Sequence, residues 1–137
     1  MEQEVGWLLD RARIRELTAR YNRCFDDGDP EGFAATFTED GFMEVVGGPT
    51  TTGRHDLAEM CRRVPWGIMH VTVDATVEVE GDSAKQHVAL VVVGRAAKPG
   101  DKPKLMSTGR YEDDLVRTAD GWLFARRSCT LDGWKEP

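Results

Sequence analysis

The apolar positions of this chain change their spacing once, near residue 70. Before that point they recur at steps typical of one helix face, as in the series Trp7, Ile14, Leu17, Tyr21 and Cys24, which predicts an amphipathic helix. From residue 70 to residue 80 apolar and polar residues alternate, and a period of two indicates a half-buried strand. We therefore expect helices first and a sheet afterwards.

Turn-forming residues divide this pattern into elements. Gly28 follows the first helix, and Asp29–Pro30 predicts an N-cap with proline in the first turn of a short helix that extends to Phe37. The other predicted elements are a strand over residues 42–46, a third helix capped by Thr51 or Thr52, and, after the 70–80 strand, strands over residues 84–97, 105–116 and 122–131. This order predicts an α+β fold in which the helices pack on one face of a curved, antiparallel sheet.

The length, composition and charge of the chain limit the classes of protein and partner that it can represent. The chain has 137 residues, 40% of them hydrophobic, and a net charge of −6, which fits one folded domain and disfavours nucleic acid or an anionic membrane as a partner. The N-terminus lacks the order of a signal peptide, and no apolar run is long enough to span a bilayer. Cys24, Cys61 and Cys129 are odd in number and show no metal-ligand spacing. We expect reduced cysteines, no metal and a cytoplasmic protein.

An ordered set of short motifs runs through nearly the whole chain. The set comprises Tyr21 with Asp26 and Gly28–Asp29, then Phe37–Asp40, Gly53–Arg54, His70, Gly81–Ala84, Gly109–Tyr111 and Gly121–Trp122. It resembles the SnoaL-like family of the nuclear-transport-factor-2-like superfamily. The resemblance implies a single domain over residues 1–137, a cone-shaped α+β barrel with three N-terminal helices packed in a strongly curved, mostly antiparallel sheet. It also implies a homodimer or higher homo-oligomer and catalysis without a cofactor.

The resemblance also implies catalytic residues. In the dehydratase-like branch, which includes scytalone dehydratase and the bile-acid dehydratases, an aspartate at the end of the first helix pairs with a strand histidine, and a tyrosine assists. Asp26, His70 and Tyr21 match these positions. Arg127, five residues after the Trp of Gly121–Trp122, matches an arginine that some members use to bind substrate. No second histidine is found at the position that scytalone dehydratase would require, since His87 lies too near the hairpin turn.

These residue types suit proton transfer. A neutral imidazole can remove a proton from a carbon next to a carbonyl, and a carboxylate can orient the ring and stabilise the imidazolium. Tyr21 could polarise the carbonyl, and Arg127 could bind an oxygen of the substrate. We expect a lyase or isomerase that eliminates water, isomerises or cyclises a carbonyl compound.

The sequence spacing of His70, Tyr21 and Asp26 allows the catalytic group to form only if two structural conditions are met. Strict alternation places His70 with the polar residues Thr72 and Asp74, so a bulge or a late strand start must turn it inward. Five residues separate Tyr21 from Asp26, roughly 140° around an ideal helix. The dyad therefore depends on local distortions that the sequence does not reveal. Without them, His70 is a hydrogen-bonded strand residue, Asp26 a helix end and Tyr21 a core residue.

Large apolar residues are spread over the elements expected around a pocket. We predict that it is lined by Trp66, Met69, Phe42 and Tyr111, together with Met60, Leu90 and Met106. Such a lining suits a small hydrophobic, aromatic or polycyclic substrate. The same side chains could instead fill the core.

Two other function classes remain open. An epoxide hydrolase or ring-closing enzyme on the same fold would need an acid and an arginine facing inward from the later strands, for which Arg110 and Glu112 are candidates. A ligand-binding or assembly module would bind without turnover. A pH–rate profile whose histidine-dependent limb disappears in His70→Ala would favour the dyad enzyme.

Overall fold

The computed structural model describes residues 1–64 and 67–133 as three helices and one six-stranded sheet. The helices are α1 (Glu2–Asp26), α2 (Pro30–Ala34) and α3 (Arg54–Arg63). The strands are β1 (Phe37–Val45), β2 (Thr50–Thr52), β3 (Ile68–Glu80), β4 (Ser83–Gly94), β5 (Lys104–Thr118) and β6 (Gly121–Leu131). The predicted α+β class is confirmed.

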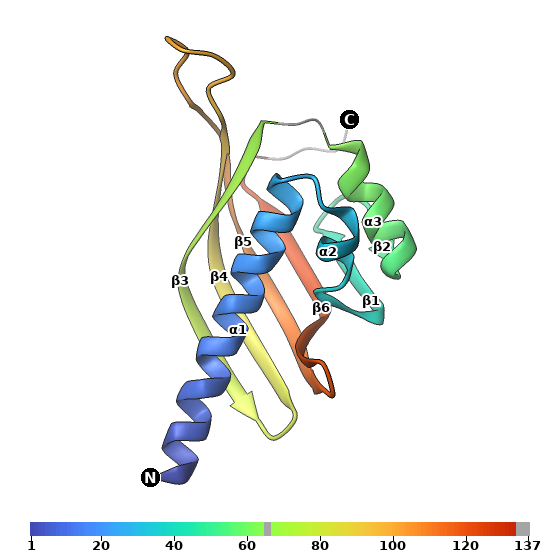
Figure 1. The fold of residues 1–137 in the computed structure, drawn as a ribbon, viewed down its shortest axis with the longest axis vertical. Coiled ribbons are helices and arrows are strands. Elements are labelled where there is room, and N and C mark those ends of the chain that lie inside the picture. Colours follow the sequence, from blue (N-terminus) through green and yellow to red (C-terminus); the bar gives the residue numbers. More distant parts are fainter. Residues whose placement is uncertain (65–66, 134–137) are drawn as a thin grey trace.

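The sheet is a meander to which the first two strands are added at one side. Strands β3 to β6 follow one another as antiparallel neighbours, and β1 pairs with β6 in parallel, giving the order β2-β1-β6-β5-β4-β3. In Figure 1 the long helix α1 crosses one face of this curved sheet, while α2 and α3 lie beside β1 and β2. The helices therefore cover one face of the sheet, and β2 and β3 are its two edge strands.

The predicted boundary between the first two helices is correct. Gly28 has a φ of +71°, a conformation that glycine adopts without strain, and it follows the last turn of α1. Asp29 caps α2, since its Oδ1 accepts a hydrogen bond from the Gly32 backbone N–H at 3.0 Å, and Pro30 opens the first turn. This turn fixes the end of α1, where Asp26 lies.

Two boundaries differ from the predictions. The short helix ends at Ala34, and Phe37 begins β1 rather than closing the helix. The threonines expected to cap the third helix form β2 instead, and Gly53, with no side chain to donate or accept, is the N-cap of α3. The β-branched threonines pair with β1 more favourably than they would end a helix.

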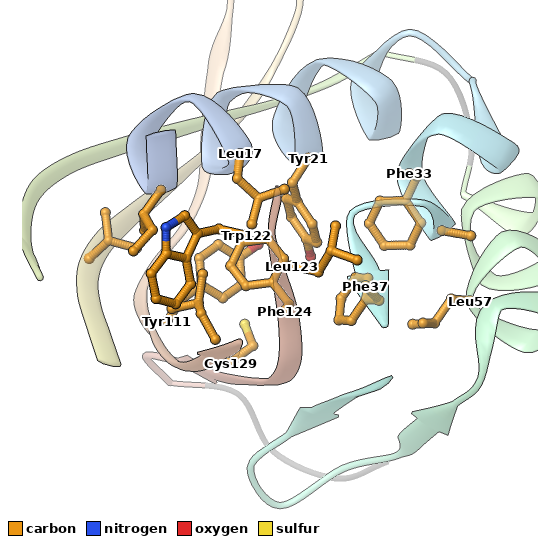
Figure 2. Close-up of a cluster of buried hydrophobic side chains, with 14 of the residues drawn as sticks. Leu17, Tyr21, Phe33, Phe37, Leu57, Tyr111, Trp122, Leu123, Phe124 and Cys129 are labelled. Carbon is orange, nitrogen blue, oxygen red and sulfur yellow. The ribbon is translucent and has the colours of Figure 1, made fainter. Parts of the chain in front are cut away.

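The core lies between α1 and the sheet and is rich in aromatic side chains. Figure 2 shows Leu17 and Tyr21 pointing from α1 toward Phe37, Tyr111 and Phe124. All five are buried. Burial of this area supplies the main driving force for folding, and aromatic pairs add to it.

Trp7 does not belong to this core, although it was predicted to lie on the buried stripe of the first helix. Its side chain is 47% exposed, and the Arg11 guanidinium stacks on its ring at 4.5 Å from the centroid. Figure 1 shows the reason: the first turns of α1 extend past the end of the sheet.

A bulge in β3 sets the direction of its first half. Asp74 and Ala75 together oppose the single residue Val88 of β4, and Asp74 has a φ of +56°. On the N-terminal side of the bulge, His70 pairs with Val92 and so faces the helices; on the other side Val77 does. The bulge required to turn His70 inward is therefore present.

Candidate active site

Asp26 and His70 are joined by two hydrogen bonds. The Oδ1 atom of Asp26 lies 2.6 Å from Nδ1 of the imidazole, and its Oδ2 atom accepts from the backbone N–H of His70 at 2.8 Å. Their side chains are 6% and 10% exposed. A carboxylate that accepts from both groups holds the ring in one orientation and favours the tautomer with hydrogen on Nδ1. The Nε2 atom is then the free acceptor.

Two aromatic rings flank the imidazole. The Phe25 and Tyr21 rings meet it nearly at right angles, with centroids at 4.9 and 6.5 Å. Such edge-to-face packing leaves the ring little freedom to rotate. Five residues separate Tyr21 from Asp26, a spacing that places them on different faces of the helix. In the structure Tyr21 contacts the imidazole through its ring, while its hydroxyl contacts Met43.

The dyad lies at one end of a cavity between α1 and β3. The cavity has a volume of about 680 Å³, a size typical of small-molecule sites. Its lining includes Asp26 and His70, the apolar residues Ala19 and Val88, and the arginines Arg15, Arg23 and Arg95. Met69, Val71 and Val73 of β3 also border the cavity, but their side chains alternate with His70 and Thr72 and therefore face the other side of the sheet. The wall thus combines apolar and charged groups, which suits a molecule that carries polar substituents on an apolar framework.

One face of α1 supplies a row of polar side chains to this cavity. Thr18, Asn22 and Asp26 are four residues apart, and residues at that spacing lie above one another on a helix. Asn22 donates through Nδ2 to the Thr72 hydroxyl of β3 at 3.0 Å. The helix is thus tied to β3 at two levels, by Asn22 and by the dyad.

A second polar group lies deeper, between the cavity and the core. Arg127 forms an ion pair with Asp113, with distances of 2.8 Å from Nε to Oδ1 and 3.1 Å from Nη2 to Oδ2. Gln86, which lines the cavity, donates to the same carboxylate at 2.9 Å. The Arg127 guanidinium also stacks on Tyr21, at 4.3 Å from its centroid, and on Tyr111, at 3.8 Å. Both charges are fully buried and compensate each other, although Nη1 of Arg127 has no hydrogen-bond partner within the described residues.

Tyr21, Tyr111 and Arg127 were predicted to contact substrate, but none of them lines the cavity. The Tyr21 hydroxyl donates to the Met43 sulfur at 3.3 Å. Burial raises the pKa of Tyr21 to about 12 and that of Tyr111 well above 10, so both phenols are neutral at ordinary pH. The arginine and the tyrosines form one packed group behind the cavity wall.

The other residues predicted to line the cavity lie in different parts of the fold. Met69 borders the cavity. Phe42 lies in β1, on the far side of β6 from the cavity, and Trp66 lies outside the described residues. Leu90 is buried in the core, and Met106 is exposed on β5.

The charged residues considered for the alternative chemistries lie elsewhere. Arg110 and Glu112 of β5 are largely exposed and neighbour each other at 4.0 Å. They flank the inward-facing Tyr111, and alternation along a strand therefore places them on the opposite face of the sheet. His87 faces the same way and pairs with Thr76 across the strands.

Sequence reasoning missed Asn22, Gln86 and Thr72. Asn22 could have been found, because it lies four residues before Asp26 on the same helix face. Gln86 and Thr72 lie among polar residues on alternating strands, and only the register of β3 and β4 shows that they point inward.

With this geometry established, the family of the chain is clear. Residues 7–128 match the model of the SnoaL-like domain, and the chain belongs to that family. Its six-stranded curved sheet with three helices is the cystatin-like fold of NTF2-like proteins, as the following structures show.

Three solved structures are similar over most of the chain. An NTF2-like protein with a cystatin-like fold from Novosphingobium aromaticivorans is 32% identical, with a TM-score of 0.87 over 97% of this chain and 89% of its own. A variant of Rv3472 from Mycobacterium tuberculosis, a protein of unknown function, is 35% identical, with a TM-score of 0.82 over 91% of this chain and 77% of its own. A candidate scytalone dehydratase from N. aromaticivorans is 22% identical, with a TM-score of 0.78 over 90% and 85%, and shares the fold.

The described part of the chain contains neither a cluster of metal ligands nor a helix that could span a membrane. Within residues 1–64 and 67–133, no three His, Cys, Asp or Glu side chains are grouped so that they could hold a metal ion. No helix of this same part of the chain is long and apolar enough to cross a membrane.

Proposed function

We propose that this protein is a cofactor-independent lyase or isomerase that acts on a small carbonyl compound. His70 is the general base, and Asp26 orients it. The observation that carries the proposal is the double hydrogen bond from His70 to Asp26 at the end of a cavity of about 680 Å³. Membership of the SnoaL-like family and the fold shared with a candidate scytalone dehydratase support it.

In the proposed reaction, Nε2 of His70 takes the proton from the carbon next to the substrate carbonyl. The electron pair of that C–H bond moves toward the carbonyl and forms an enolate-like state. In a dehydration, the pair then forms a C=C bond while the C–O bond to a β-hydroxyl breaks. The imidazolium returns its proton to the departing oxygen, which leaves as water. In an isomerisation, the proton is returned to another carbon instead.

Asp26 contributes by stabilising the charged intermediate form of the base. When His70 gains a proton on Nε2, the imidazolium lies 2.6 Å from a carboxylate oxygen. This attraction is stronger in a largely buried site than in water. A positioned acid–base group of this kind accelerates a reaction by about 10²–10⁴-fold.

The test is a comparison of single variants on a set of cyclic β-hydroxyketones. Elimination of water creates a conjugated enone, whose ultraviolet absorbance reports turnover directly. We expect His70→Ala to lose about 10²–10⁴-fold in kcat while it still binds the ketone product. His87→Ala is the matched control, because His87 is exposed on the same sheet and does not line the cavity.

The outcome also separates this proposal from a ligand-binding module. Turnover by His70→Ala at the wild-type rate would exclude His70 as the base. Binding by wild-type protein with no turnover of any ketone in the set would favour a module that only binds.

A further inference from the structure

The cavity carries two buried oxygen acceptors besides the dyad, one from Gln86 at the level of Thr18 and one from Asn22, which lies between Thr18 and Asp26 on α1. Gln86 and Asn22 both line the cavity and are 3% and 8% exposed. Gln86 Oε1 and Asn22 Oδ1 have no hydrogen-bond partner within the described residues. Buried polar atoms in folded proteins nearly always have a partner, so two such oxygens in residues that line the cavity are candidate acceptors for a donor group of a ligand.

We propose that Gln86 and Asn22 form a subsite for a hydroxyl group of the substrate, with Gln86 Oε1 as its principal acceptor. The substrate class that follows is a cyclic or polycyclic carbonyl compound with a hydroxyl remote from the reacting carbon. This inference deepens the proposed function and rests on it for the identity of the reacting end, since the same cavity holds both subsites.

The orientation of the Gln86 amide is fixed by its neighbours. Its Nε2 atom donates to Asp113 Oδ2 and to the Thr18 hydroxyl oxygen, each at 2.9 Å. Asp113 is held by Arg127 and, as a carboxylate in an ion pair, can only accept. The amide nitrogen must therefore face Asp113, and the oxygen is the atom left for the cavity. Arg127 is a positioning residue in this arrangement and does not touch the substrate.

The Asn22 amide is oriented less strictly than that of Gln86, because the Thr72 hydroxyl that it contacts can both donate and accept. Its Nδ2 atom donates to the Thr72 hydroxyl oxygen at 3.0 Å, which leaves Oδ1 free. Asn22 lies one helical turn from Thr18, which contacts Gln86, and one turn from Asp26. It can therefore share a hydroxyl with Gln86 or bind a second one nearer to the dyad.

The length of the cavity follows from the helix that forms its wall. Thr18 and Asp26 are eight residues apart, which corresponds to roughly 12 Å along α1. A substrate that donates to Gln86 and places its reacting carbon beside His70 fills this span less about 3 Å of contact at each end, which leaves roughly 6 Å between its two interacting groups. Between the two ends its framework would contact Ala19 and Val88, so an apolar ring system with a polar group at each end fits best.

These acceptors give the cavity a means of selecting its ligand. A ligand hydroxyl can donate to these oxygens, whereas a hydrogen or a methyl ether at the same position leaves them without a donor. The difference is expected to be at least about tenfold in affinity.

The experiment measures the binding of three bicyclic ketones by isothermal titration calorimetry. They are 6-hydroxy-2-tetralone, 6-methoxy-2-tetralone and unsubstituted 2-tetralone, which share the carbonyl and differ only at the remote position. The unsubstituted ketone is smaller than the hydroxylated one, so weaker binding of that compound is not caused by steric exclusion. We expect wild-type protein to bind the hydroxylated ketone at least about tenfold more tightly than either of the others.

Two substitutions assign this preference to its residues. Gln86→Met and Asn22→Leu remove one acceptor each at similar side-chain size, and we expect each to reduce the preference, Gln86→Met more strongly. Gln3→Met is the matched control, because Gln3 is exposed in the first turn of α1. Equal affinity of the wild-type protein for all three ketones would overturn the proposal, even if a variant fails to fold. A preference that survives both substitutions would also overturn it.

The test does not depend on catalysis. His70→Ala should keep the preference for the hydroxylated ketone, because its acceptors are unchanged. If this variant also retains full turnover, the proposed function fails and the hydroxyl subsite stands. If turnover depends on His70 and all three ketones bind equally, the subsite fails and the proposed function stands.

Discussion

Asp26 binds both the backbone and the side chain of His70. One carboxylate oxygen accepts from the His70 backbone N–H at 2.8 Å, and the other lies 2.6 Å from Nδ1. The backbone contact fixes where the first residues of β3 lie relative to α1, and the side-chain contact fixes which ring nitrogen carries the hydrogen. The position of the β3 backbone and the tautomer of His70 therefore depend on the same carboxylate.

Replacing this carboxylate by an amide should reverse the histidine tautomer. In Asp26→Asn, the amide oxygen can still accept from the His70 backbone N–H, but its nitrogen then donates to Nδ1 and moves the ring hydrogen to Nε2. We expect kcat to fall by about 10²–10⁴-fold with little change in thermal stability. Steady-state kinetics and thermal unfolding measure the two effects. Asp120→Asn, in an exposed turn, is the control, and full activity of Asp26→Asn would contradict the proposed role.

Removing the Tyr21 hydroxyl should affect alkaline stability more than turnover. This hydroxyl contacts Met43 rather than the cavity, so Tyr21→Phe should lose far less than the 10²-fold expected of an acid–base group. Burial raises the pKa of Tyr21 from 10.0 to about 12. The contribution of the neutral phenol to stability is therefore complete below pH 10 and is lost as the pH rises toward 12.

Chemical denaturation across that alkaline range tests the sign of the effect. The wild-type protein should lose more free energy of unfolding than Tyr21→Phe as the pH rises above about 10. A large loss of kcat in Tyr21→Phe at neutral pH would instead restore the catalytic role that the family resemblance implies for this tyrosine.

Asp10 should stabilise the fold at neutral pH and lose this effect in acid. Arg117 donates to both of its carboxylate oxygens, at 2.8 and 2.9 Å, and Trp122 donates to one of them at 3.0 Å. The hydrogen bonds from Arg117 are the main reason that the pKa of Asp10 is lowered from 3.8, and that from Trp122 adds to the effect. A lowered pKa means stabilisation that is complete above pH 4 and disappears as the pH falls through the folded-state value.

Urea denaturation of Asp10→Asn at two pH values measures this contribution. We expect a loss of about 1–3 kcal/mol at pH 7 and a smaller difference from the wild-type protein near pH 3. Asp82→Asn is the control, since Asp82 also contacts Arg117 but its side chain is 86% exposed. A difference that stays constant with pH would contradict the assignment.

Breaking the buried ion pair between Arg127 and Asp113 should lower the free energy of unfolding more than breaking an ion pair at the surface. Arg127→Met leaves the Asp113 carboxylate buried without its partner, and such a loss typically costs about 3–5 kcal/mol. The neighbouring Arg126 is the matched control, because it is partly exposed and pairs with Glu44 and Asp114. Arg126→Met should cost about 0–1 kcal/mol. Equal losses of unfolding free energy in the two variants would show that the ion pair has no special role.

The sequence predicted the fold class and the dyad more completely than the walls of the site. Local periodicity marked the helices and the four later strands, and Gly28–Asp29–Pro30 marked the turn after Asp26, because these signals depend only on neighbouring residues. The inward direction of His70 depends on a bulge at Asp74, which strict alternation contradicts. Local signals do not report such a register shift.

The residues of the cavity wall were harder to predict for a related reason. Arg127, Tyr111 and Tyr21 pack against one another behind the wall, and only the register of β4 to β6 shows that Gln86 lies in front of them. A polar residue on a strand carries no local sign of a cavity. The oligomeric state and the cytoplasmic location stay predictions from the sequence.

Because of the extra residue at Asp74, the inward-facing side chains of β3 have even numbers in its first half and odd numbers in its second half. Even-numbered side chains point toward α1 before it, as at His70 and Thr72, and odd-numbered ones point inward after it, as at Val77. If β3 were one residue shorter at this point, either His70 or Val77 would face away from α1. With the extra residue, one strand presents the imidazole to the cavity and still buries Val77 in the core.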